Sequence, residues 1–268
     1  MFYMGQYLFG VVKKIVPSSI RKYINFKMQR RRVNSMCNSG FPGFVILMPY
    51  EDSIKIDRVF NGIRYYSQVY QDYYLDRYIF NGKENGVFLD VGANDPIQIN
   101  NTYFFEHNRK WSGLAFEPMP KMNQRWKELR EVECIQIALG CQSGEIEFCE
   151  YEDDSMSGVA NEVDYNGKVV NKYTVKVETL ANILKQYKIT HVDFMTLDVE
   201  GAELDVLRGI DFDAVSIDYI VIENNKGVKK EKLIRDFLIS HNYSLKAKLW
   251  IDEIWEKKHV GAYSEEKI

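Results

Sequence analysis

Cysteine is scarce in this chain, and no two cysteines stand at the close spacing that a zinc site needs. Four occur among 268 residues, at positions 37, 134, 141 and 149. A chain of this length buries a sufficient core without disulfides, so we expect four free thiols and a reducing compartment. Neither a structural zinc ion nor a disulfide framework is expected.

Long apolar runs are lacking as well. The first twelve residues carry no charge, but a helix that spans a membrane needs about 20 apolar residues. In a secretory signal the positive charges precede the apolar stretch, whereas Lys13, Lys14 and further basic residues follow it here. We therefore expect a cytoplasmic protein without a spanning helix.

Acidic residues are missing from the first 50 positions, which carry eight Lys or Arg. The remainder carries 27 basic and 38 acidic residues, so we divide the chain into a basic extension, residues 1–60, and an acidic domain, residues 61–268. Apolar residues recur at helical spacing from Ile20 to Met28, which predicts a basic amphipathic helix. Two alternatives stay open for residues 1–32: peripheral contact with the inner face of a membrane, or packing on the domain. Nucleic acid is not an expected partner, because the domain is acidic and contains no recognisable nucleic-acid module.

From about residue 82 the chain alternates continuous apolar runs with helical patterns. This rhythm predicts an α/β fold with a mostly parallel, doubly wound sheet covered by helices on both faces. The expected strands cover residues 86–91, 112–117, 133–139, 192–198 and 217–223, and the expected helices cover residues 100–108, 120–130, 177–187, 202–209 and 229–242. A hairpin strand at 144–149 and a polar stretch at 151–171, a candidate lid, interrupt the rhythm.

Carboxylates stand at the ends of four expected strands. Asp90, Glu117, Asp198 and Glu223 each close an apolar run or precede its last residue. Ligands of open α/β sheets bind beyond the carboxyl ends of the strands, so these side chains are expected to line one polar pocket.

Glycine is sparse in the turn after the first strand. A dinucleotide site would show G-x-G-x-x-G there, but only Gly92 is present, and Pro96 stands where the helix should begin. A pyrophosphate is therefore not expected in this turn. Another nucleoside cofactor, S-adenosylmethionine, carries no phosphate. It needs instead a cradle for its amino acid end and an acid for its ribose hydroxyls. Glu117, at the end of the second strand, is placed to accept hydrogen bonds from those hydroxyls.

Several segments in this order resemble the FkbM family of methyltransferases over about residues 64–260. They are YSQVYQD at 66–72, FLDVGAND at 88–95, NT at 101–102, GLAFEP at 113–118 and LDVEGAELDVL at 197–207. The resemblance implies a Rossmann-like class I fold with a seven-stranded sheet, and transfer of methyl groups from S-adenosylmethionine. It also implies acceptors such as hydroxyls of sugars, glycolipids or related glycan precursors.

By this resemblance, cofactor-binding roles fall on Asp90, Gly92, Asn94 and Glu117, with Ala138 near the adenine. Three residues before the first strand match family elements that close over cofactor or acceptor. Of these, Gln71 is assigned to the cofactor, and Gln68 and Asp72 to the substrate.

A hydroxyl acceptor must lose its proton, which calls for a base or a metal. His191 precedes the fourth strand, and seven residues at about 3.3 Å each place it roughly 23 Å from Asp198. His107 and His241 close helices on that same side, and His259 cannot be placed. We therefore predict Asp198 and Glu200 as the catalytic carboxylates.

Alternatives remain open around these carboxylates. Glu200 could instead complement the positive end of the helix that begins near Ala202. Asp198, Glu200 and Glu223 could together hold Mg²⁺, although a divalent metal is not expected. Glu223 and Asp252 are predicted to bind the substrate. An amine acceptor and a non-catalytic cofactor-binding module are the rival functions.

Overall fold

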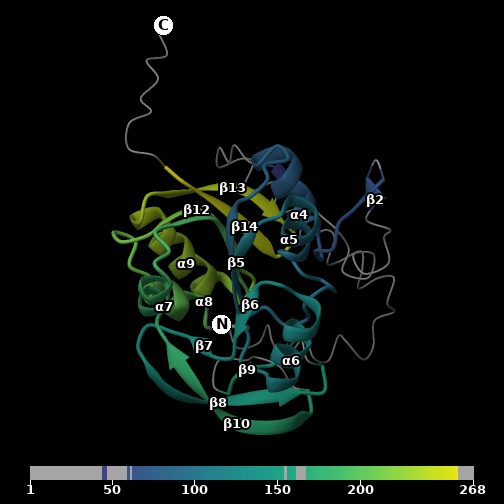
Figure 1. Ribbon diagram of the computed structural model, residues 1–268. Helices are drawn as coiled ribbons and strands as arrows, with labels where there is room; N and C mark the ends of the chain where they lie inside the picture. The colour runs from purple at the N-terminus through teal and green to yellow at the C-terminus, as the bar shows by residue number, and fades with distance from the viewer. Residues whose placement is uncertain (1–43, 47–58, 61, 154–155, 161–166, 259–268) are drawn as a thin grey trace, which may run out of the picture.

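The structure is a computed structural model that describes residues 44–46, 59–60, 62–153, 156–160 and 167–258 (Figure 1). The predicted basic helix, residues 1–32, and His259 lie outside the described residues. Among the residues that are described, no helix is long and apolar enough to cross a membrane.

The main sheet has eight strands in the order β1-β13-β14-β12-β11-β4-β5-β6. Their bounds are β1 Phe44–Ile46, β4 Val87–Val91, β5 Ser112–Phe116, β6 Glu133–Ile135, β11 His191–Leu197, β12 Ser216–Glu223, β13 Tyr243–Leu249 and β14 Asp252–Lys257. All neighbours pair in parallel except β14, which is antiparallel to both β12 and β13. The predicted seven-stranded, mostly parallel sheet is confirmed, and β1 adds a three-residue strand at one edge.

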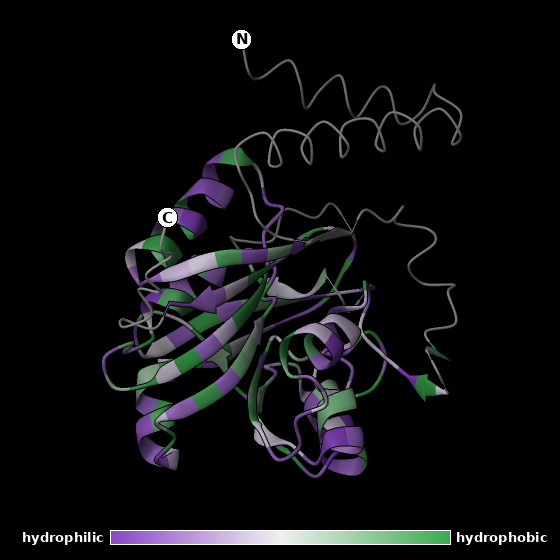
Figure 2. Cartoon of the chain, turned by 90° about the horizontal axis from the view of Figure 1, so that it is seen from above, coloured by the Kyte–Doolittle hydropathy of each residue, from purple (hydrophilic) through white to green (hydrophobic). Residues whose placement is uncertain are grey.

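Helices cover both faces of this sheet, as the prediction of a doubly wound fold requires. On one face lie α7 Leu180–Tyr187, α8 Glu203–Arg208 and α9 Val228–Ser240, whose apolar residues share a core with Met195 and Leu197 of β11. On the other face lie α4 Gln71–Tyr74, the π-helix Leu75–Ile79 and α5 Tyr103–Arg109. Figure 1 shows the two groups on opposite sides of the strands. The strands in Figure 2 are banded by hydropathy, as alternating side chains require.

A second, four-stranded sheet has the order β7-β10-β8-β9, with bounds β7 Ala138–Leu139, β10 Val169–Glu178, β8 Gly144–Tyr151 and β9 Gly158–Val159. It lies below the main sheet in Figure 1, and the chain passes between the two sheets at residues 136–137, after β6, and through α7, after β10. The helix α6 Pro120–Leu129 connects β5 to β6. The expected strand 133–139 is therefore divided: Ile137 N–H bonds to the Ile135 carbonyl, and Ala138 pairs with Val177 of β10.

Other expected boundaries also move. The helix predicted over 177–187 begins at Leu180, because Thr179 caps it by accepting the Asn182 N–H at 3.2 Å and the preceding residues belong to β10. Within the candidate lid, residues 158–159 and 169–171 form strands, while 154–155 and 161–166 lie outside the described residues. The hairpin β13–β14 and the short pair β2 Val59–Phe60 and β3 Ile63–Arg64 were not predicted as strands.

An aromatic layer fills the face that carries α5. Phe194, fully buried in β11, contacts the rings of Phe80, Phe88, Phe105 and Trp111 at centroid distances from 4.9 to 6.1 Å. Because these rings come from strands and helices far apart in the sequence, the layer fixes β4 and β11 side by side.

We predict that Phe194→Ala lowers the free energy of unfolding by about 3 to 5 kcal/mol, because it leaves a cavity among these rings. Val228→Ala, at a residue 76% exposed, is the control and should change it by less than about 0.5 kcal/mol. Urea denaturation of the two variants measures the difference. Equal urea midpoints for the two variants would show that the aromatic layer does not hold β4 and β11 together.

Candidate active site

A single cavity of about 1130 Å³ extends over the carboxyl ends of the strands, from β6 across to the β13–β14 turn. Nine predicted site residues line it: Gln68, Asp90, Gly92, Asn94, Glu117, Ala138, Asp198, Glu200 and Glu223. Three others, Gln71, Asp72 and Asp252, are not among its lining residues. The structure thus brings most of the predicted site together.

The turn after β4 forms the floor of the cavity. Gly92 has φ +78°, and a Cβ there would stand 1.7 Å from the backbone oxygen of Asp198. Its N–H donates to the Phe116 carbonyl at 3.1 Å, and the Asp198 N–H donates to the Val91 carbonyl at 3.0 Å. The ends of β4, β5 and β11 therefore meet at backbone contact, which only a glycine at position 92 permits.

Asp90 is buried beneath this turn and fixes the next loop. Its Oδ2 accepts from Thr102 Oγ1 at 2.6 Å and from Asn100 Nδ2 at 3.1 Å. Burial raises its pKa to about 6, although these hydrogen bonds and Arg130 act in the opposite direction. The carboxylate thus holds the loop at 100–102, which explains why an Asn-Thr pair accompanies the Asp-x-Gly turn.

Glu117 follows β5 and joins two loops at the cavity wall. Its Oε2 accepts the Asn94 N–H and its Oε1 accepts the Met119 N–H, both at 2.8 Å. Asn94 takes φ +42°, and its carbonyl accepts from Trp126 Nε1 at 2.8 Å. These two bonds fix the Glu117 carboxylate in place at the cavity wall.

An apolar slot lies beside Glu117. Ala138 forms its floor, and Met119, Met122 and Phe148 pack around it. The side chains come from β7, β8 and the start of α6, so the second sheet supplies one wall. A flat aromatic ring fits a slot of this composition.

Carboxylates gather at the other half of the cavity. Carboxylate oxygens of Asp198, Glu203 and Glu223 lie within 4.8 Å of one another. Lys226 Nζ bonds Glu200 Oε2 at 2.6 Å and Glu223 Oε2 at 2.8 Å. Glu203, and not Glu200, bonds the backbone that precedes α8: it accepts the Gly201 N–H at 2.9 Å. The Glu200 carboxylate instead bonds Lys226.

This crowding changes the ionisation of the group. Asp198 opens onto the cavity but is otherwise enclosed by protein atoms, and burial together with the charges of Glu223 and Glu200 raises its pKa well above the ordinary value. Burial and Glu223 also raise the pKa of Glu200, against Lys226. Burial lowers the pKa of Lys226, but the two glutamates outweigh it, so the ammonium stays charged. Asp198 is therefore a stronger base, once ionised, than an ordinary aspartate.

Three predicted site residues that do not line the cavity form bonds that hold neighbouring segments in place. Asp72 is fully buried and its oxygens accept from the Ser67 N–H at 3.1 Å and the Tyr73 N–H at 2.9 Å, so it holds its own turn. Gln71 Nε2 donates to Asp252 Oδ2, beside the lining residue Gln68. Asp252 pairs across the sheet with Glu223, and its burial and that neighbour raise its pKa to about 7.

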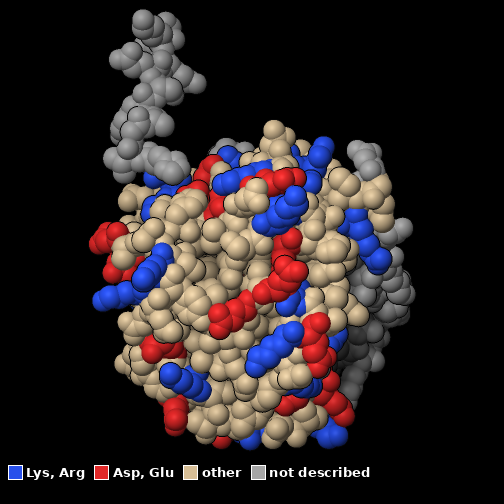
Figure 3. Space-filling view, in the orientation of Figure 1, with Lys and Arg blue, Asp and Glu red and all other residues tan. Residues whose placement is uncertain are grey.

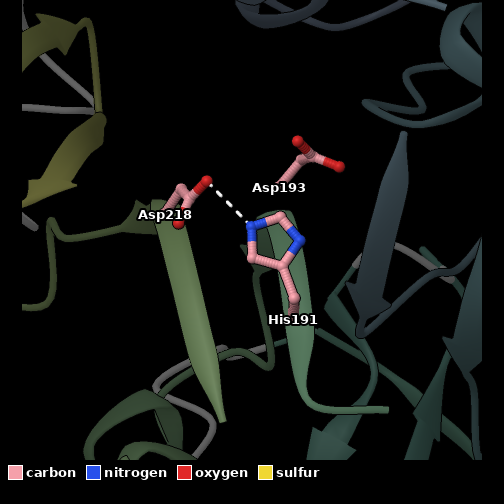
Figure 4. Close-up of side chains that lie close together, drawn as sticks. All are labelled: His191, Asp193 and Asp218. Carbon is pink, nitrogen blue, oxygen red and sulfur yellow. Dashed lines mark hydrogen bonds and ion pairs between the residues drawn. The ribbon is translucent and has the colours of Figure 1, made fainter. Parts of the chain in front are cut away.

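The histidines that the structure describes lie away from this cavity. His191 opens β11 at the opposite end from Asp198, and its Nε2 bonds Asp218 Oδ2 at 3.0 Å, with Asp193 close by (Figure 4). Asp193 is bonded to Lys83 and to the Val87 N–H. This placement agrees with the length argument that sets His191 far from Asp198.

Lys226 and Trp250 are among the lining residues that were not assigned to the site. Lys226 follows β12 by three positions, and only the turn beyond the strand brings it back over Glu223. Trp250 stands in the β13–β14 turn, where aromatic residues beside acidic ones suit sugar rings and hydroxyls, but only Asp252 was assigned there. Of those aromatic residues, Trp255 is buried in the core and Trp250 lines the cavity.

We predict that Gly92→Ala abolishes ligand binding in the cavity and destabilises the fold, because its Cβ would overlap the Asp198 carbonyl. Gly144→Ala is the matched control, since a Cβ there meets nothing within 4 Å. Thermal unfolding with and without S-adenosylmethionine compares them. A cofactor-dependent shift in Gly92→Ala as large as that of the control would refute this close contact.

Two curated methyltransferases are similar to parts of this chain. A 2-O-methyltransferase, NoeI, of Sinorhizobium fredii is 27% identical over 146 residues, covering 47% of this chain and 58% of that protein. The hexuronic acid methyltransferase AglP of Haloferax volcanii is 25% identical over 151 residues, covering 54% of this chain and 59% of that protein. The chain thus spans somewhat under three fifths of the length of these curated relatives.

Among solved structures, a methyltransferase FkbM from Methylobacillus flagellatus has a TM-score of 0.47 at 13% identity, covering 71% of this chain and 48% of that chain. A methyltransferase from Pyrococcus furiosus has a TM-score of 0.41 at 14% identity, covering 78% and 96%. The model of the methyltransferase FkbM domain matches residues 90–245, which contain the β4 turn, Glu117 and the whole carboxylate cluster. The chain belongs to the FkbM methyltransferase family.

Proposed function

We propose that this protein transfers the methyl group of S-adenosylmethionine to a hydroxyl oxygen of a sugar or a sugar-bearing lipid. The observation that carries the proposal is the single cavity, which joins a nucleoside-shaped half around Glu117 and Ala138 to a carboxylate-rich half around Asp198. The two halves meet at Gly92, where the turns after β4 and β11 touch.

The residues of the first half fit the cofactor. Glu117 lines the cavity with a carboxylate held by two backbone N–H groups, which suits it to the two ribose hydroxyls, and the slot of Ala138, Met119 and Phe148 fits the adenine. The cavity is lined by eight acidic residues and two basic ones, Arg125 and Lys226. Such a field favours a sulfonium cation over the neutral product that remains after transfer. When bound, S-adenosylmethionine supplies a methyl group that is already activated by positive sulfur.

The residues of the second half fit a hydroxyl acceptor. Transfer needs the acceptor oxygen to lose its proton while it is aligned with the methyl group. Asp198 is placed to accept that proton, because it follows β11 next to Gly92 and opens onto the cavity. Burial, Glu223 and Glu200 keep its pKa raised, and the two glutamates together with Lys226 offer further hydrogen-bonding groups to the acceptor. A divalent metal at Asp198, Glu200 and Glu223 stays a hypothesis, and the three carboxylates that lie within 4.8 Å of one another are those of Asp198, Glu203 and Glu223.

The relatives support the choice of acceptor. One is a 2-O-methyltransferase and the other a hexuronic acid methyltransferase, and both align with roughly half of this chain. An oxygen acceptor also agrees with the presence of a base of raised pKa, since an amine acceptor needs less help with its proton.

We predict that Glu117→Ala weakens the binding of S-adenosylmethionine at least tenfold, because hydrogen bonds to a charged group contribute about 1.5 to 3 kcal/mol. Glu145→Ala, at an exposed position of β8, is the control and should bind normally. Calorimetric titration gives both dissociation constants. Unaltered binding by Glu117→Ala would remove the ribose assignment, and no binding by the wild type would sink the proposed function.

We predict that, in a plot of kcat against pH, Glu223→Gln shifts the fall in kcat at acidic pH (the acidic limb) to lower pH. Catalysis requires ionised Asp198, so the rate falls as the pH drops through the raised pKa of that carboxyl. Removing the negative charge of Glu223 lowers this pKa, and the limb follows. Release of labelled methyl groups to a panel of methyl glycosides between pH 5 and 9 gives the profile.

Asp198→Asn completes that experiment. Loss of the base should reduce kcat by about 10²- to 10⁴-fold while leaving cofactor affinity intact. The exposed Glu147→Gln is the matched control for the change of charge. An acidic limb that stays in place in Glu223→Gln, or full activity of Asp198→Asn, would rule out Asp198 as the base.

A further inference from the structure

Trp250 has an unusual backbone conformation at the cavity wall. It stands between β13 and β14 with φ +55°, a left-handed conformation that bulky residues rarely adopt. Its turn is held on both sides: the Asn224 N–H and Lys248 Nζ both donate to the Ile251 carbonyl, at 3.0 and 2.9 Å. The surrounding bonds thus impose a conformation that is unfavourable for a bulky residue.

The sheet order sets Trp250 on the side away from the nucleoside half. The cavity runs from β6 and β5 across β4 and β11 to β12 and β14, and adjacent strands lie about 4.8 Å apart. The turn of Trp250 therefore lies roughly 14 Å from β4, beyond Asp198 and beside the lining residues Glu223 and Lys226. An acceptor placed to reach Asp198 would contact this turn.

Trp250 also differs from the other tryptophans. The chain has four, and Trp111, Trp126 and Trp255 are at most 3% exposed, whereas Trp250 is partly exposed and lines the cavity. An accessible indole beside hydrogen-bonding carboxylates is suited to a ligand with one apolar face and polar edges. A pyranose ring has this form, since its C–H bonds gather on a face and its hydroxyls lie around the rim.

Charge narrows the ligand further. Asp198, Glu200 and Glu223 surround this half of the cavity, and Lys226, the one basic residue that lines it in the described part of the chain, is bonded to both glutamates. A second carboxylate brought into this half would meet these like charges, and the described lining residues offer it only a lysine that is already paired. Neutral hydroxyls, by contrast, can donate to these oxygens. On the face shown in Figure 3, Lys and Arg are scattered among Asp and Glu and form no patch that would gather an anionic glycan.

We propose that Trp250 is the stacking platform for an electrically neutral pyranose, whose rim hydroxyl then faces Asp198. This inference rests on the proposed function and adds the class of acceptor and the residue that selects it. It separates this chain from its relative that is a hexuronic acid methyltransferase, because it excludes the uronate.

The first test uses Trp250→Gly, because glycine adopts a positive φ without strain and removes only the ring. We expect a fold at least as stable as the wild type and unchanged S-adenosylmethionine affinity. The KM for methyl glucoside should rise at least tenfold, with a smaller change for Trp250→Phe. Lys110→Gly is the control for altered stability, because Lys110 also has a positive φ, at the end of α5. Its KM should equal that of the wild type.

The second test measures how far a ligand shields the Trp250 ring from solvent. In the presence of S-adenosylhomocysteine, methyl glucoside should shield the accessible tryptophan from quenching by acrylamide, whereas methyl glucuronide, which differs by its carboxylate, should shield it at least tenfold less. Trp250→Gly should lose the shielding. Equal shielding by the two glycosides, or a KM unchanged in Trp250→Gly, overturns this inference but leaves the methyltransferase assignment standing. A wild type that binds the cofactor and methylates none of the glycosides overturns the proposed function itself.

Discussion

The site depends on one backbone contact, between Gly92 in the turn after β4 and the carbonyl of Asp198 after β11. The contact sets the two halves of the cavity side by side without any intervening side chain. Asp198 also donates its own N–H to the Val91 carbonyl, so the position of the proposed base is fixed by the backbone that cradles the cofactor. Alignment of acceptor oxygen and methyl group is then a property of the sheet and not of a mobile loop.

Negative charge exceeds positive charge in the second half of the cavity. Among the described residues, Asp198, Glu200, Glu203 and Glu223 share one close cation, Lys226, and burial and mutual repulsion raise the pKa of Asp198. Ionising this group therefore costs more free energy than it would in water. A negative field of this kind favours a sulfonium and disfavours an anion. The proposed base, cofactor and neutral acceptor thus share one electrostatic origin.

The sequence predicts most of the fold, because the expected strands are apolar runs and four of the five end near a carboxylate. It does not predict the break between β6 and β7, since Ala138 leaves the main sheet to pair with Val177, some forty residues later. The β13–β14 hairpin was not assigned, although Tyr243, Leu245, Ala247 and Leu249 alternate with polar residues along β13. At the site, strand ends and motifs indicate Asp90, Glu117 and Asp198, but they cannot show that Asp72 turns inward to hold its own loop.

The residues that were missed share a physical reason. Lys226 and Trp250 lie in turns, where neither periodicity nor a strand end marks a side chain, and their roles arise from three-dimensional proximity to Glu223. The strained φ of Trp250 and that of Glu200, +55° in each, occur on the two sides of the carboxylate cluster. Bulky residues retain such a conformation only where surrounding bonds enforce it. The rigidity that brings Asp198 to the cofactor thus extends outward, through these turns, to the surface that meets the acceptor.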